Sequence, residues 1–80
     1  MAKRRVMFTF PAKLIAKPII YKLAKEFNVI TNIRRADVAE DQGWVVLELD
    51  GKADDIQRGI DWVTAEGVRV DPIEGDIIEG

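Results

Sequence analysis

Two spacings of apolar residues alternate along this chain, and their order is the strongest constraint on its fold. Every second residue is apolar in several segments, as in strands that bury one face: residues 4–10, 29–36, 44–50 and 68–70. Apolar residues recur at helical spacing in two others, residues 19–27 and 54–66. The segments therefore follow one another in the order β-α-β-β-α-β.

Turn and capping residues separate these segments. Pro18 stands where the first turn of a helix tolerates proline, and Gly67 after the second helix is a typical C-terminal stop. Asp54 followed by Gln57 is expected to form a capping box. Gly59, inside the second helix, weakens that helix by about 1 kcal/mol relative to alanine. We therefore expect a neighbouring backbone or aromatic ring to pass close to it.

This order predicts an α+β fold of the ferredoxin-like βαββαβ type, in which two helices cover one face of a four-stranded antiparallel sheet. The right-handed crossover rule leaves few alternatives. A chain of 80 residues is one domain. We expect its core to span about residues 4–72 and an acidic tail to follow at residues 73–80.

The chain contains neither cysteine nor histidine, which limits its chemistry. Thiolate nucleophiles, disulfides, cysteine-bound iron–sulfur clusters and ordinary zinc sites are excluded. The usual general base near neutral pH is also missing. We therefore expect a protein that is not an enzyme, with no catalytic residues, no metal site and no cofactor.

Charge is distributed unevenly over the two halves of the chain. Residues 1–35 hold nine basic residues and one acidic residue, whereas residues 36–80 hold three basic and thirteen acidic residues. A basic half can attract nucleic acid or membrane headgroups. In the predicted fold the basic face of the first helix lies beside the acidic second helix, which favours internal neutralisation instead. Neither a signal peptide nor a membrane-spanning run is recognisable, so we expect a cytoplasmic protein without membrane insertion or a nucleic-acid partner.

The face of the sheet that carries no helices is expected to be partly apolar. Its apolar members are Met7, Ile30, Trp44 and Val46. A contiguous apolar patch with a polar rim is typical of an interface, and the simplest partner is a second copy related by two-fold symmetry. The alternative is that the isoleucines of the acidic tail fold back over this face.

Polar side chains beside that patch suggest a site for a small ligand. Asn32 and Arg34 are expected to point onto the uncovered face near Trp44. Arg34 can hold a carboxylate in a bidentate fork, and Asn32 can bond an amino or carboxyl group. The alternative is a solvated strand edge whose charges discourage aggregation.

The stretch FNVITNIRRADV, followed by Gly43, VVLELDG and DDIQRGIDWVTAEGVRVD, resembles the NIL domain, which is named for an Asn-Ile-Leu motif. Asn32 and Ile33 match the first two motif positions, and Arg34 replaces the leucine. The resemblance implies a ferredoxin-like fold. In the transporter branch of this family the module is the C-terminal regulatory domain of the ATPase subunit of methionine-importing ABC transporters. There it pairs with a second copy and binds methionine near the dimer interface.

The resemblance implies a non-enzymatic regulatory module that forms a homodimer and binds a methionine-like amino acid at the open sheet face. Its ligand-binding residues would be Asn32, Ile33, Arg34 and Trp44. Other family members are fused to iron–sulfur ferredoxin domains or stand alone. The alternative is therefore a protein-interaction adaptor for an iron–sulfur or transport partner, without a small-molecule ligand. No phosphate-binding G-x-x-x-x-G-K-[ST] loop occurs, so we expect a stand-alone domain.

Two other functions found on this topology agree less well with the residues. The RNA-recognition motif stacks bases on aromatic residues of its central strands, but the segment GWVVLEL lacks the required K/R-G-F/Y-G/A-F pattern. An acylphosphatase-like hydrolase requires an anion-binding loop rich in backbone N–H groups. The segment PAKLIAKP has no glycine and two prolines.

Overall fold

The structure is a computed structural model that describes residues 1–73. Its elements, in chain order, are β1 Ala2–Pro11, α1 Ala12–Ile15, α2 Ile19–Phe27, β2 Ile30–Val38, β3 Gln42–Gly51, α3 Ala53–Glu66 and β4 Arg69–Pro72. The expected β-α-β-β-α-β order is confirmed, with the single-turn helix α1 as an addition. The acidic tail expected at residues 73–80 lies outside the described residues, apart from Ile73.

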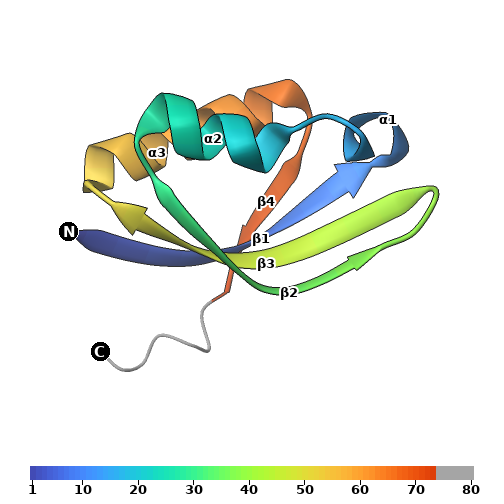
Figure 1. Cartoon of the computed structure of the whole chain (residues 1–80), viewed down its shortest axis with the longest axis horizontal. Helices are drawn as coiled ribbons and strands as arrows, with labels where there is room; N and C mark the ends of the chain where they lie inside the picture. The colour runs from blue at the N-terminus through green and yellow to red at the C-terminus, as the bar shows by residue number, and fades with distance from the viewer. Residues whose placement is uncertain (74–80) are drawn as a thin grey trace.

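The four strands form one antiparallel sheet in the order β2-β3-β1-β4. Figure 1 shows α2 and α3 side by side on one face of this sheet, which is the predicted ferredoxin-like arrangement. In this order β1 and β3 are central strands, whereas β2 is an edge strand. Within residues 1–73, no helix has the length and hydropathy that crossing a bilayer requires.

The hydrophobic core lies between the helices and the two central strands. Leu23 of α2 and Ile56 and Val63 of α3 are fully buried against the central strands, where Phe8 and Leu47 are also fully buried. Burying one such side chain stabilises the fold by about 1.5–3 kcal/mol. The apolar stripes found in the sequence therefore form the core, and they fix both helices over β1 and β3.

Helix α1 and the start of α2 cover one end of the sheet. No element was expected for residues 12–17, but Ala12–Ile15 form one helical turn that buries Leu14. The Lys17 backbone N–H donates to the Leu14 carbonyl at 3.1 Å, which closes this turn before Pro18 begins the approach to α2. The segment therefore lies against the sheet as packed structure.

The ends of α3 agree only partly with the sequence signals. The capping box expected from Asp54 and Gln57 is wrong, because Lys52 is the N-cap and no side chain bonds the cap. The Gln57 amide instead accepts a bond from Arg4 of β1 and donates one to Asp61. The stop at Gly67 is confirmed, since this residue has φ +110°, a conformation that glycine adopts without a side-chain clash.

The glycine within α3 marks the closest approach of the two long helices. A Cβ atom placed on Gly59 would lie 2.5 Å from Cδ1 of Leu23 and 3.5 Å from Cβ of Phe27. The close neighbour expected for Gly59 is therefore helix α2, which contributes Leu23 and the aromatic residue Phe27. Phe27 also packs against Trp62, with ring centroids 5.7 Å apart.

Helix α2 is much shorter than the hairpin that lies beneath it. Its 9 residues span about 14 Å. The 9 residues of β2 span about 30 Å. The far end of the β2–β3 hairpin therefore extends beyond α2, as Figure 1 shows.

We predict that Gly59→Ala lowers the free energy of unfolding by about 1 kcal/mol. Overpacking against Leu23 costs about 1–3 kcal/mol, whereas the higher helix propensity of alanine contributes only about 1 kcal/mol. Urea denaturation followed by circular dichroism measures this change. In a Leu23→Val background the clashing Cδ1 atom is absent, so the same substitution should be neutral or stabilising. A Gly59→Ala protein more stable than the natural chain would contradict the proposed close packing.

Candidate functional site

The edge strand β2 is the most exposed element of the sheet. Eight of its nine residues are exposed, whereas its neighbour β3 is mostly buried. Most large apolar side chains that remain exposed lie on β2 or on α2 above it: Tyr21 (62%), Ile30 (62%), Ile33 (55%) and Val38 (59%). Such a concentration of apolar surface along an unpaired sheet edge is typical of an interaction site.

A bulge in β2 changes which side chains face which side of the sheet. Ile33 pairs with Leu47, but the next pair is Arg35 with Val46, so Arg34 has no partner in the ladder. Uniform alternation predicted Arg34 as the arginine on the uncovered face near Trp44. Arg35 takes that place, with its guanidinium carbon 5.9 Å from the centre of the Trp44 ring. The extra residue of a bulge shifts the alternation by one position, a change that periodicity alone does not reveal.

The register also separates residues that were expected to form one site. Asn32 pairs with Glu48, and Glu48 pairs with Arg5 on β1. Trp44 lies four residues from Glu48 along β3, a distance of about 13 Å. Asn32 and Trp44 therefore lie at different points along the sheet.

Asn32 is part of a polar row that crosses the uncovered face. The Arg5 guanidinium and the Glu48 carboxylate form an ion pair of 3.1 Å, with both side chains about a quarter exposed. Asn32 is exposed at the β2 end of this row. The row offers an amide, a carboxylate and a guanidinium next to one another at the sheet edge.

Ile33 faces the helix layer, as alternation predicts, but it does not reach the core. Its partner in the ladder is the fully buried Leu47, yet Ile33 itself remains more than half exposed. The helices cover the central strands and leave this part of the edge strand open. Ile33 therefore lies on the helix side of the sheet and stays open to solvent.

The four residues expected to form an apolar interface differ in exposure. Val46 is only 6% exposed although it lies on the uncovered face, while Met7 and Trp44 are half-buried. Val46 is flanked in the sheet by Met7 and by Arg35. Only Ile30 of the set is exposed. The accessible apolar surface therefore lies along β2, and not across the middle of the face.

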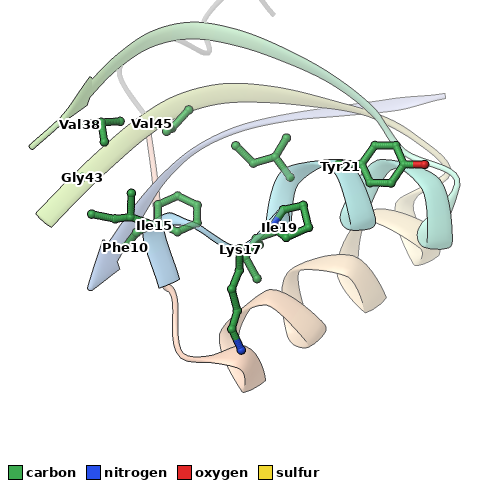
Figure 2. Close-up of a pocket in the computed structure, with 10 residues that line it drawn as sticks. Phe10, Ile15, Lys17, Ile19, Tyr21, Val38, Gly43 and Val45 are labelled. Carbon is green, nitrogen blue, oxygen red and sulfur yellow. The ribbon is translucent and has the colours of Figure 1, made fainter. Parts of the chain in front are cut away.

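A pocket of about 210 Å³ lies on the helix side of the sheet, where the hairpin extends past α2. Figure 2 shows Phe10, Ile15, Val38 and Val45 pointing toward this space from strands and helix. The full lining consists of Phe10, Ile15, Lys17, Pro18, Ile19, Ile20, Tyr21, Val38, Gly43 and Val45. No sequence motif indicates this pocket, because its walls come from two segments that are distant along the chain, residues 10–21 and 38–45.

Two polar side chains border this otherwise apolar pocket. Lys17 and Tyr21 are both exposed, and Figure 2 shows the Lys17 side chain extending away from Val38 and Val45. None of the lining residues within the described part of the chain is acidic. Among the described residues, no three acidic side chains come together as a possible metal site.

The expected neutralisation between the two long helices is not made by ion pairs. The ion pairs described for residues 1–73 join Arg5 to Glu48, Arg58 to Asp55, and Arg69 to Asp71. None of them joins α2 to α3. The lysines of α2 therefore keep a positive surface beside the pocket.

Comparison with solved structures supports the fold. The C-terminal domain of an ABC transporter/ATP-binding protein from Enterococcus faecalis superposes with a TM-score of 0.78 at 19% identity, covering 91% of this chain and 86% of that one. The de novo designed protein Foldit4 gives 0.56 at 10% identity, covering 86% and 89%. An amidase of the hydantoinase/carbamoylase family from Burkholderia phymatum gives 0.52 at 11% identity, covering 91% of this chain and 28% of that one. At these identities the likeness shows the shared fold alone.

The sequence comparison identifies the family. No curated protein matches the chain at the significance threshold. The NIL domain, in contrast, matches residues 4–72, which is nearly all of the described chain and contains all of its strand pairings from Arg4 onward. The match includes Asn32 and Ile33 on the exposed edge strand. This chain belongs to the NIL domain family.

Proposed function

We propose that this chain is a non-enzymatic regulatory module that binds a small, methionine-like amino acid and pairs with a second copy, acting in the cytoplasm on a transporter partner. The observation that carries the proposal is the exposed edge strand β2, which bears the family residues Asn32 and Ile33. Membership of the NIL family and the structural likeness to an ABC transporter C-terminal domain support the partner class.

The proposed ligand site is the polar row at the β2 edge. A free amino acid carries an ammonium and a carboxylate. The Glu48 carboxylate and the Asn32 side-chain carbonyl can accept hydrogen bonds from the ammonium. Arg34 in the bulge is exposed and close along the strand, so it can bind the ligand carboxylate. In this arrangement Trp44 lies too far away to touch the same ligand.

The proposed dimer pairs the two β2 edges. A two-fold axis perpendicular to the sheet makes the two strands antiparallel and keeps both helix layers on the same side. The arginines after the bulge would repel a neighbouring strand. Pairing is therefore confined to residues 30–33, where Ile30 and Ile33 offer exposed apolar surface on either side of the sheet. Ile33 then contacts the second copy.

A protein-interaction adaptor for a transport or iron–sulfur partner is the second candidate. The exposed apolar side chains of Tyr21, Ile33 and Val38 favour it. These side chains lie on the helix side of β2 or above it, away from the Asn32 row. In that case the edge would bind a partner protein without any amino acid.

We predict that methionine binds the natural chain in isothermal titration calorimetry. Asn32→Ala and Arg34→Ala should each weaken this binding by about tenfold, because hydrogen bonds to charged groups contribute about 1.5–3 kcal/mol. Arg69→Ala is the matched control, because Arg69 is an exposed arginine on the opposite edge strand, and it should bind methionine as the natural chain does. Absence of heat with every amino acid at millimolar concentration would remove the ligand and favour the adaptor.

The dimer can be tested by cysteine scanning, because the chain has no cysteine of its own. Single substitutions Ile30→Cys, Thr31→Cys, Asn32→Cys and Ile33→Cys are oxidised mildly and analysed on non-reducing gels. We expect a high yield of covalent dimer at the position on the two-fold axis and a much lower yield at its neighbours, since a disulfide requires Cα atoms about 4.4–6.8 Å apart.

Arg69→Cys on the opposite edge is the control and should stay monomeric. Equal yields at every position, or a monomer in sedimentation equilibrium at millimolar protein, would rule out pairing through β2.

A further inference from the structure

We propose that the pocket between the start of α2 and the end of the β2–β3 hairpin binds a small monocarboxylate with an unbranched apolar chain. This site is on the helix side of the sheet. It is independent of the proposed amino-acid site, which is at Asn32 on the uncovered side. The occupant follows from three properties of the pocket: its size, its apolar walls and the sign of the charge at its rim.

The size and lining suit a short apolar chain. The pocket measures about 210 Å³, and an apolar cavity of about 150 Å³ already holds a benzene molecule. Phe10 and Val45 form its floor on the central strands, and Val38 and Gly43 close it from the hairpin. Ile15 and the first residues of α2 form the opposite wall. A chain of about six carbons fits this volume and buries apolar surface that is otherwise partly hydrated.

The charge at the rim selects an anion. Among residues 1–73, Lys17 is the charged residue of the lining. The surrounding segment, residues 12–28, also carries Lys13, Lys22 and Lys25 against the single acid Glu26. Lys17 is exposed and forms none of the ion pairs described for residues 1–73. Its flexible stem can therefore turn its ammonium toward a carboxylate at the pocket mouth.

The lining also discriminates against amino acids and amines. No carboxylate of residues 1–73 lines the pocket, so an ammonium group placed there would lose hydration without gaining a partner among them. A repulsive Lys17 adds to this penalty. A carboxylate without an α-amino group therefore binds better than the amino acid with the same chain, which separates this site from the one proposed at Asn32.

The probe is sodium hexanoate, titrated into the ¹⁵N-labelled full chain and followed by amide chemical shifts. We expect shifts at the amides of Ile19, Ile20, Val38 and Gly43, with none at Asn32 or Glu48. Hexylammonium and 2-aminohexanoate, which have the same chain with a cationic or an added ammonium group, should bind at least about tenfold more weakly.

Two pairs of variants test the size and charge arguments. Val38→Trp fills the pocket and should weaken hexanoate binding at least about tenfold, while Ile30→Trp, an equally exposed position of the same strand on the other face, should change it less than about twofold. Lys17→Gln should weaken binding by up to about fivefold at low salt. Lys3→Gln, at an exposed lysine near the start of β1 and at the opposite end of that strand from Phe10, should leave it unchanged.

The outcomes are distinct from those of the proposed function. Hexanoate shifts confined to the pocket support this inference even when methionine fails to bind. Methionine shifts at Asn32 with no hexanoate response at the pocket overturn the inference and leave the proposed function standing. Equal affinity for hexanoate and hexylammonium, or shifts spread over the whole surface, also overturns it.

Discussion

The helix layer is too short for the sheet that it covers, and the surface properties of this protein follow from that mismatch. The apolar stripes of α2 and α3 hold both helices over the central strands, and Gly59 lets the two helices approach closely at Leu23. The hairpin of β2 and β3 continues beyond α2, toward the end of the sheet where the single-turn helix α1 lies. Apolar side chains that would be buried under a longer helix therefore remain accessible on β2, and a pocket opens beneath the start of α2.

Some features of the edge strand β2 favour pairing with another strand, and others limit it. Its first residues present isoleucines on both sides of the sheet. The bulge and the two arginines then interrupt the ladder, and such interruptions protect edge strands from unrestricted pairing. A partner strand can therefore align with a short, defined part of β2, and the remainder stays available to solvent or to a ligand.

The sequence predicted the architecture well because the fold depends on periodicity. The strand and helix order, the α3 stop at Gly67 and the close neighbour of Gly59 all follow from patterns within short windows. The site was predicted less well, because it depends on register and on the extent of the helix layer. The burial of Val46, the exposure of Ile33 and the exchange of Arg34 for Arg35 beside Trp44 each require knowledge of strand pairing.

The pocket was missed for a related reason. Its lining residues read as ordinary core positions in the sequence, and only the relative lengths of α2 and the hairpin leave them partly uncovered. No local motif encodes that difference in length.

The bulge at Arg34 reverses which residues of β2 face the helices. Before it, even-numbered residues face away from the helices; after it, odd-numbered residues do. Val38 thereby faces the helix side, and the charged Arg35 and Asp37 face outward. The residue at position 34 has no partner in the ladder and is exposed, so the fold places little demand on its polarity. An arginine in place of the family leucine is therefore compatible with the scaffold, and this position can diverge in chemistry while the strand around it keeps its geometry.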